Sequence, residues 1–354
     1  MGVLGKSKKL IRRIIRKFLE FYPLGPLSLS LPSFSPTGLP SDAVLRELQL
    51  LGNFTYLPNG GNMGDTIIAT AEYLFFDKHG LKYNMFRDGA CTENLVHAGG
   101  GAFVPYYDIA YDRLSRILPN NSHLKRIILL PASFYDRPDF LELVDERFTI
   151  FCREEKSRDY LLSSGVKGNV ILAHDMALLL TEDFQKLIPV FRYGFKKVWR
   201  EIMASIPKLT QQGGYTVAYF IRADDESNTD WSKIGIQPTL DLSACAFSWC
   251  EDRRDVAFLC KLFFAGIDMA DIVVTDRLHV GIGSMLMGKE VFLLDNSYGK
   301  VAGVYKHSMK QCPRVHYVDD VQDLPSILAQ TIAEGKIHRT ASLENMKKIG
   351  KALP

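Results

Sequence analysis

From about residue 42 onward, short apolar runs alternate with helical stretches, and no other feature limits the possible folds of the chain as strongly. Strands that are apolar throughout are buried on both faces, as in parallel sheets. Their alternation with helices is typical of a doubly wound α/β fold. In the first half we expect strands at residues 54–57, 83–86, 94–97, 126–130, 148–152 and 170–173, and helices at 66–77, 107–118 and 156–163.

A second series of the same kind follows a helical, charge-mixed stretch at 183–210 and the adjacent Gly213 and Gly214. Its strands are expected at 216–221, 272–274 and 291–294, with 245–249 as a weaker candidate, and its helices at 252–265, 278–287 and 321–334. We therefore predict two Rossmann-like domains at 42–180 and 211–335. A connecting helical segment at 181–210 joins them, and a C-terminal helix follows at 336–354.

The first 41 residues differ from the rest of the chain. The first 20 carry a net charge of +6, and apolar residues recur among them at helical spacing, namely Leu10, Ile11, Ile14, Ile15, Phe18 and Leu19. A basic amphipathic helix of this kind suits the plane of an anionic membrane surface. The alternatives are a helix packed on the body and a solvated tail. The stretch up to residue 41 is rich in Pro and Ser and is expected to be an irregular linker.

Composition excludes several classes of protein. With 47 % hydrophobic and 23 % charged residues, the 354 residues are typical of a globular protein of two domains. Without its first 20 residues the chain carries a net charge of −3, which argues against nucleic acid as a partner. Six cysteines without a CxxC motif predict neither a disulfide scaffold nor a metal site. The sequence contains no run of about 18 apolar residues, so it predicts no transmembrane helix.

The motif GGNMGD at residues 60–65 follows the first predicted strand and opens the first predicted helix. Its glycines let backbone N–H groups approach an anion, and a helix N-terminus favours negative charge. The spacing is neither GxGxxG nor a Walker A motif, so it is no nucleotide fingerprint. Asp65 could alternatively act only as an N-cap.

The motif HAGGG at 97–101 ends another predicted strand. The three glycines, Gly99, Gly100 and Gly101, imply that the backbone closely approaches either a ligand or a neighbouring helix. Open α/β sheets place ligands at this end of their strands. His97 could be a core histidine and is not put forward as a catalyst.

The motif TDRLH at 275–279 places an arginine and a histidine at a strand-to-helix turn. Arg277 offers a planar fork for a carboxylate or phosphate, and His279 can pass protons near neutral pH. The structural alternative is an Asp276–Arg277 ion pair with His279 as a helix cap.

The motif DNSYGK at 295–300 follows the next predicted strand. Ser297, Tyr298 and Lys300 can hold an anion or a sugar hydroxyl, unless Asn296 and Gly299 only build a turn.

Two weaker candidates also follow predicted strands: Arg222, and a ligand-facing loop formed by PASF at 131–134.

Together these motifs resemble the polysaccharide pyruvyl transferase family over about residues 55–310. The resemblance rests on GGNMGD, HAGGG, LLPASF, FCREEKSRDYL followed by AHDMAL, and TDRLHVGIGSMLMGKEVFLLDNSYGK. It implies a GT-B-like fold with two Rossmann-like domains facing across a cleft. It also implies transfer of pyruvate from phosphoenolpyruvate to a sugar, forming a ketal and releasing phosphate. No metal or other cofactor is expected for this reaction.

The resemblance also implies roles for the residues of the motifs. Arg277 is expected to bind the phosphate or carboxylate of the donor, and His279 is the candidate general acid/base. Lys300, with Ser297 and Tyr298, could complete the anion site.

Arg222 is a lesser candidate for the same charge. On the acceptor side, Asn62 and Asp65 are expected to face the sugar, with Gly99, Gly100 and Gly101 beside them. Asp65 is a candidate base for the acceptor hydroxyl. The chain continues HAGGG as AF where the family more often has a GGG-N/D-FGD-like sequence, which puts the acceptor contacts in doubt.

The expected acceptor is a surface polysaccharide or its lipid-linked precursor, at the inner face of the cytoplasmic membrane, with residues 1–20 on the anionic lipid surface. One alternative is a nucleotide-sugar glycosyltransferase on the same fold, for whose ribose-binding acidic residue Asp295 is a loose fit. The other is a non-catalytic scaffold, against which the clustered Arg, His and Lys argue.

Overall fold

The computed structural model describes residues 41–87, 89–187, 196–337 and 339. The predicted N-terminal helix and linker at 1–40 and nearly all of the predicted C-terminal helix lie outside the described residues. The strands are β1 (Asn53–Leu57), β2 (Gly61–Asn62), β3 (Lys82–Met85), β4 (Asn94–His97), β5 (Gly100–Phe103), β6 (Arg126–Phe134), β7 (Phe148–Cys152), β8 (Asn169–Leu172), β9 (Thr210–Gln212), β10 (Tyr215–Phe220), β11 (Phe247–Ser248), β12 (Ile272–Thr275), β13 (Glu290–Leu293) and β14 (Val315–Tyr317). The helices are α2 (Ser41–Leu51), α3 (Asp65–Lys78), α4 (Ile109–Asn120), α5 (Pro138–Leu143), α6 (Glu155–Ser163), α7 (Lys196–Ala204), α8 (Arg253–Ile267), α9 (Leu278–Leu286), α10 (Lys300–Val304) and α11 (Leu324–Ala333).

The first sheet is parallel and has the order β3-β1-β4-β6-β7-β8, with β5 added beside β6. The chain forms β1, adds β3 on one side, and then crosses to add β4 on the other. Ligands of open α/β sheets bind at such a switch point, outside the carboxyl ends of the strands. The loops that follow β1 and β4 there are the motifs GGNMGD and HAGGG.

The second sheet has the order β14-β13-β12-β10-β9. The strands β10, β12, β13 and β14 are parallel, and β9 is antiparallel to β10. Because parallel strands end at the same edge, the segments after β10, β12 and β13 lie side by side. These segments carry Arg222, TDRLH and DNSYGK.

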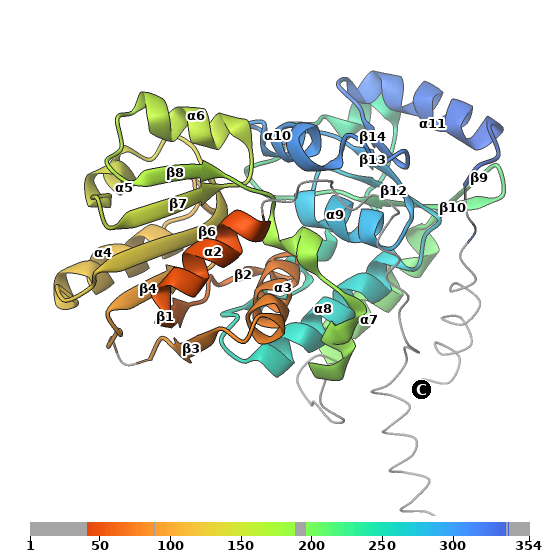
Figure 1. Cartoon of the computed structure of the whole chain (residues 1–354). Coiled ribbons are helices and arrows are strands. Elements are labelled where there is room, and N and C mark those ends of the chain that lie inside the picture. Colours follow the sequence, from red (N-terminus) through yellow and green to blue (C-terminus); the bar gives the residue numbers. More distant parts are fainter. Residues whose placement is uncertain (1–40, 88, 188–195, 338, 340–354) are drawn as a thin grey trace, which may run out of the picture.

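The two sheets share a continuous apolar core. Helix α3 is buried along most of its length, because its sequence TIIATAEYLFF is apolar on nearly every side. It packs against α8, and the two helices lie side by side in the centre of Figure 1. One hydrophobic cluster extends from α2 and β1 through α3, α8 and α9 to β13. The division of the chain at residues 180 and 210 stays a prediction.

The structure differs from the predicted elements at two motifs. Residues 131–134 are not a loop, because β6 continues through them to pair with β5 and β7. The strand accommodates Pro131, which lacks an N–H, at a register shift between Leu129 and Ala132. The last two glycines of HAGGG also lie in a strand, since β5 begins at Gly100.

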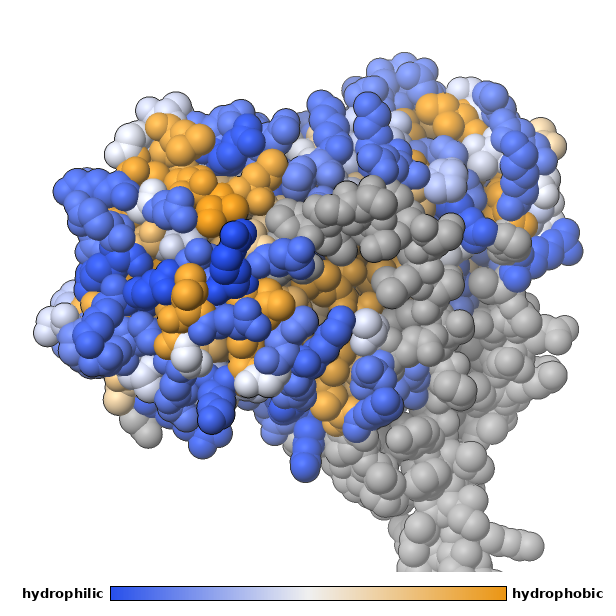
Figure 2. Space-filling view, in the orientation of Figure 1, coloured by the Kyte–Doolittle hydropathy of each residue, from blue (hydrophilic) through white to orange (hydrophobic). Residues whose placement is uncertain are grey.

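No helix in the described ranges is long and apolar enough to cross a bilayer. On the face shown in Figure 2 hydrophilic residues dominate, and hydrophobic residues are exposed in patches, one of them near α2. Leu50 of α2 is exposed.

Candidate active site

A cavity of about 250 Å³ is lined by residues of β5, of the β2–β11 ribbon and of the segments that follow strands of both large sheets. Seven of the residues predicted from the sequence line it: Asn62, Asp65, Gly101, Arg222, Arg277, His279 and Lys300. Four others do not: Gly99, Gly100, Ser297 and Tyr298. The cavity therefore brings together motifs that are more than 200 residues apart in the sequence.

His279 lies in the first turn of α9, between two carboxylates from the other half of the chain. Its Nδ1 is 3.6 Å from Oδ1 of Asp65, and its Nε2 is 3.6 Å from Oδ2 of Asp175. Gly64 allows this approach, because a Cβ at that position would lie 3.0 Å from the Cβ of His279. A proton on either ring nitrogen thus has a carboxylate nearby.

Arg153 is a site residue that the sequence analysis did not single out. It follows β7, is completely buried and lines the cavity. Its Nη1 donates to Asp175 at 2.7 Å and lies 3.5 Å from Nε2 of His279, and its Nε donates to Ser133 at 2.8 Å. Burial by itself raises the pKa of Asp175, but Arg153 and His279 outweigh it and hold that pKa well below its usual range. Asp175 is therefore an anion that binds the arginine and lies within ion-pair distance of the histidine.

Arg277 does not pair with Asp276, which was the alternative left open by the sequence. Its Nε donates to Oδ1 of Asp241 at 3.1 Å, and its Nη1 lies 2.7 Å from Oδ2 of Asp224. Asp276 accepts instead from the backbone N–H of Arg222 at 2.8 Å. Burial raises the pKa of Asp276 to about 6. Arg277 thus reaches the cavity as a buried cation with its fork directed by two carboxylates.

Arg222 and Lys300 share the carboxylate of Glu226. Oε2 of Glu226 lies 2.7 Å from Nη1 of Arg222 and 2.7 Å from Nζ of Lys300, and Tyr107 donates to its Oε1 at 2.6 Å. Burial alone would raise the pKa of Glu226, but Lys300 and Arg222 hold it well below its usual range. Burial lowers the pKa of Lys300, and Glu226 opposes that effect. Asp224, which pairs with Arg222 at 2.8 Å, is the partly exposed member of this network.

The GGNMGD loop is built so that Asp65 points at the site. Oδ2 of Asp65 accepts from the backbone N–H of Asn62 at 2.9 Å, and Oδ1 of Asn62 accepts from the N–H of Gly64 at 2.8 Å. A Cβ on Gly61 would lie 2.0 Å from Oδ2 of Asp65, so only glycine fits there. Asn62 therefore braces the loop, while Oδ1 of Asp65 faces His279.

The HAGGG segment has a structural part and a site part. His97 is a fully buried core histidine whose pKa burial lowers to about 4. Gly99 packs on the backbone, since a Cβ there would lie 2.4 Å from the carbonyl oxygen of Pro131. Gly100 has a φ of +122°, which favours glycine. Gly101 faces the cavity, where a Cβ would lie 3.2 Å from Arg153 and 3.7 Å from Lys300.

In the DNSYGK segment Lys300 lines the cavity, whereas Ser297 and Tyr298 do not. Oγ of Ser297 lies 2.9 Å from the hydroxyl of Tyr106, and Tyr298 is buried with its ring stacked on Tyr106 and Tyr135. Oδ1 of Asp295 accepts from the backbone N–H groups of Asn296 and Ala302, so this carboxylate serves the start of α10 and does not line the cavity.

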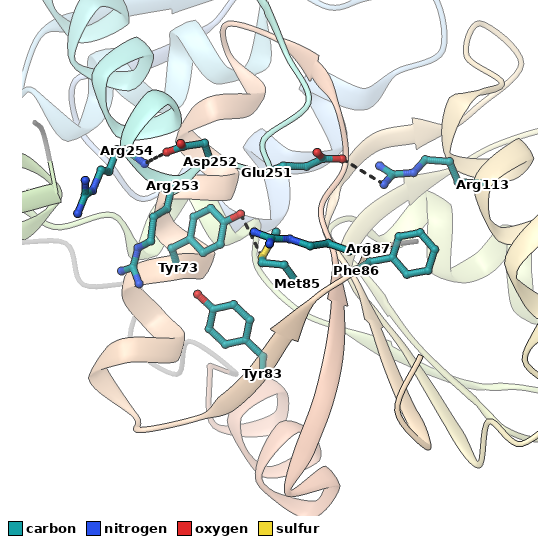
Figure 3. A pocket seen from close by; sticks show the side chains of 10 residues that line it. All are labelled: Tyr73, Tyr83, Met85, Phe86, Arg87, Arg113, Glu251, Asp252, Arg253 and Arg254. Atoms are coloured by element: carbon teal, nitrogen blue, oxygen red, sulfur yellow. Dashed lines mark hydrogen bonds and ion pairs between the residues drawn. The ribbon is translucent and has the colours of Figure 1, made fainter. Parts of the chain in front are cut away.

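A larger groove of about 830 Å³ lies near the start of α8 (Figure 3). Much of its charge is already paired. Glu251 faces Arg113 at 3.7 Å, Arg253 pairs with Asp77 outside the groove lining, and Asp252 accepts from the backbone N–H of Arg254 at 2.9 Å. None of the residues that line it is a histidine or belongs to the predicted site. We therefore assign the chemistry to the smaller cavity despite the greater volume of this groove.

A family model described as polysaccharide pyruvyl transferase matches residues 62–298, from Asn62 of the first glycine motif to Tyr298 of the last motif. The chain belongs to the polysaccharide pyruvyl transferase family. This confirms the resemblance drawn from the motifs. It supports an enzyme that transfers pyruvate to polysaccharide.

One of the individual matches has a name that agrees with this membership. The chain is 26 % identical over 337 residues to a Bacillus subtilis protein named "Putative pyruvyl transferase EpsO", covering 80 % of this chain and 94 % of that protein. It is 23 % identical over 343 residues to General stress protein 30 of the same organism, covering 84 % and 88 % of the two chains. A crystal structure titled as that of a functionally uncharacterized Klebsiella pneumoniae protein matches with a TM-score of 0.60 at 26 % identity, over 81 % of this chain and 100 % of the other.

Proposed function

We propose that this pyruvyl transferase takes phosphoenolpyruvate as its donor and forms a pyruvate ketal on a sugar of a surface polysaccharide or its lipid-linked precursor, with release of phosphate. One observation carries the proposal. Four cationic side chains, Arg153, Arg222, Arg277 and Lys300, line a single small cavity that also contains His279.

These cations suit a donor that carries both a phosphate and a carboxylate. Arginine forks bind such groups through two parallel bonds, and bonds between charged partners are the strong ones. Carboxylates of the protein already pair with these cations, so a bound donor has to compete with them. Asp224 is the member best able to move aside, because its side chain is 38 % exposed whereas that of Glu226 is 2 % exposed.

The reaction needs one proton donor and a base for each acceptor hydroxyl. The methylene carbon C3 of the donor gains a proton, a sugar hydroxyl adds to C2 and loses its proton, and the bond from C2 to the phosphate oxygen breaks. A second hydroxyl of the same sugar then adds to C2 and loses its proton. One proton is thus retained in the new methyl group and the other leaves with phosphate. His279 is the proposed acid, and Asp65 the proposed base on the acceptor side.

The proposal needs neither a metal nor another cofactor, because arginine, lysine and backbone N–H groups supply the positive field. The part of the chain that the structure describes contains no group of three or more His, Cys, Asp or Glu arranged to hold a metal ion. For a lipid-linked acceptor we further propose that residues 1–20, outside the described ranges, bring the enzyme to the anionic inner face of the cytoplasmic membrane.

Calorimetric titration of the full chain with phosphoenolpyruvate tests the donor. Arg277→Gln should weaken binding by about 1.5–3 kcal/mol, because it removes a charged hydrogen-bonding group. Arg254→Gln, in the groove of Figure 3, is the matched control and should bind as the wild type does. Equal binding by both variants would remove Arg277 from the donor site.

The same titration with a panel of nucleotide sugars tests the glycosyltransferase alternative. That alternative needs an acidic residue free to bind ribose hydroxyls, and Asp295 is engaged at the start of α10. Binding of a nucleotide sugar in place of phosphoenolpyruvate would overturn the proposed donor.

A further inference from the structure

Two aromatic side chains are exposed at the rim of the cavity. Phe247 is 52 % exposed and Trp249 is 53 % exposed, although both are large and hydrophobic. Their rings pack edge to face, with centroids 5.1 Å apart and planes at 83°. Contiguous exposed hydrophobic side chains mark ligand or partner sites more often than singly scattered ones do.

The fold holds the pair in a fixed position beside the glycine motif. Strand β11 pairs with β2, which sets Phe247 opposite Asn62. Trp249 lies over Gly60, where a Cβ would come within 2.9 Å of Cε3 of the indole. The next residue, Cys250, has a φ of +58°, which is rare for a residue other than glycine.

Contacts on both sides keep Cys250 in this strained conformation. Its carbonyl oxygen accepts from the hydroxyl of Tyr73 at 2.6 Å, and its N–H donates to Oγ of Ser248 at 3.0 Å. Strain that the surroundings maintain is typical of functional sites. Here it holds the chain that presents the indole of Trp249 at the surface.

The aromatic pair is continuous with the cavity. Phe247 and Gly60 are themselves among the residues that line it. At about 250 Å³ the cavity is smaller than the usual range of about 300–1,000 Å³ for sites that enclose a drug-sized ligand. A donor the size of phosphoenolpyruvate would occupy the cationic interior. A sugar that approaches His279 and Asp65 would therefore remain at the rim.

We propose that Phe247 and Trp249 form an aromatic platform on which the pyranose ring of the acceptor stacks. The inference rests on the proposed function and names the acceptor subsite within it. A pyranose presents C–H groups on one face and hydroxyls at its edge. Because the two ring planes are nearly perpendicular, the apolar face would stack on the indole of Trp249 and contact Phe247 at its side, while the hydroxyls at the edge point toward Asp65 and His279. After Cys250 the chain continues with Glu251, Asp252, Arg253 and Arg254, whose charges cancel, so this segment offers no net positive charge to the other occupant, an anionic lipid surface.

Tryptophan fluorescence tests the platform without requiring turnover. The chain has three tryptophans; Trp199 and Trp231 are buried, so quenching by acrylamide reports mainly on Trp249. The full chain would be titrated with methyl β-galactoside, methyl β-glucoside and N-acetylglucosamine, with sorbitol as the control that lacks a ring. At least one pyranoside should shift the emission to shorter wavelength and reduce quenching several-fold, and sorbitol should do neither.

Variants separate stacking from an indirect effect. Phe247→Ala should weaken the pyranoside response, and Trp249→Phe, which keeps a ring, should retain sugar binding by calorimetry where Trp249→Ala loses it. Leu162→Ala, another exposed apolar residue, should bind sugar normally.

The result of the sugar titration does not depend on the identity of the donor. Phosphoenolpyruvate affinity should be the same in Trp249→Ala and wild type, so failure of the donor titration would overturn the proposed function and leave the sugar titration interpretable. Emission and quenching that stay constant with every pyranoside would overturn the platform. So would pyranoside binding that survives in Trp249→Ala. Binding to anionic vesicles that Trp249→Ala abolishes, in the absence of any sugar response, would assign the pair to a membrane surface instead.

Discussion

At the scale of single residues, the site is defined by which charged groups meet around His279. Asp65 comes from the first glycine motif, Asp175 follows β8 and Arg153 follows β7. A carboxylate therefore lies beside each ring nitrogen, and a fixed cation lies beside Nε2. This arrangement is suited to proton transfer, and His279 itself lines the cavity.

His279→Gln should abolish pyruvyl transfer and leave phosphoenolpyruvate binding nearly unchanged. The donor would still meet Arg153, Arg222, Arg277 and Lys300, whereas the proton that C3 requires would have no source. Phosphate release would measure turnover, and calorimetry would measure binding. A variant that turns over at the wild-type rate would exclude His279 as the acid.

Sequence reasoning found part of this site and missed the rest for a physical reason. Arg277, His279 and Lys300 were found because they follow strands within motifs. Arg153 and Asp175 were within stretches that carried the family resemblance, but their roles depend on contacts with His279 more than 100 residues away. The available signal was that each lies within three residues of the end of a predicted strand.

At the scale of elements, the strands with continuous apolar sequence were predicted almost to the residue. This succeeds for β4 and β7 because burial on both faces leaves a nearly continuous apolar run in the sequence. It fails for β5, which is short and begins with two glycines, and for the end of β6, which contains a proline. Pairing with neighbouring strands forms β5 and the end of β6, although the residues there have little preference of their own for a strand.

Two glycines of the β4–β5 segment should respond differently to alanine. Gly99→Ala should destabilise the fold by about 1–3 kcal/mol, because its Cβ would lie 2.4 Å from a backbone oxygen that cannot move freely. Gly101→Ala should leave the melting temperature nearly unchanged and weaken phosphoenolpyruvate binding, because its Cβ would crowd Arg153 and Lys300. Thermal unfolding and calorimetry would measure both effects. A reversal of the two phenotypes would contradict the division of the segment into a structural and a site part.

At the scale of the whole molecule, a buried carboxyl group of α3 joins β1 to the HAGGG motif. Glu72 of α3 is fully buried; it accepts from the hydroxyl of Tyr56 and, at 2.9 Å, from the backbone N–H of Gly99. Burial raises its pKa from 4.5 to about 7, and nearby Asp175 adds to the rise, while the two hydrogen bonds oppose it.

This group should make the protein less stable as the pH rises. The folded state keeps the proton of Glu72 up to about pH 7, whereas the unfolded chain loses it near pH 4.5. The contribution of Glu72 to the free energy of unfolding is therefore fully present below pH 4.5. It falls by about 3 kcal/mol at most as the pH rises to 7.

Glu72→Gln should reduce this pH dependence. Denaturant unfolding of wild type and variant at pH 5 and pH 8 would measure it, and the variant should lose less stability between the two values. Identical losses in the two proteins would show that Glu72 ionises in the folded state as it does in water.

The pairing of β2 with β11 has a consequence for how such an enzyme can change. The ribbon joins the loop that carries Asp65 to the segment that carries Phe247 and Trp249, and Met63 adds a backbone bond to Ser243 at 2.9 Å. Under the proposed roles, a mutation that alters recognition of the sugar through this ribbon would also shift the carboxylate beside His279. Selection for a new acceptor would then act on rate and specificity together. An engineer who exchanges residues 242–250 between relatives should transplant residues 59–65 with them.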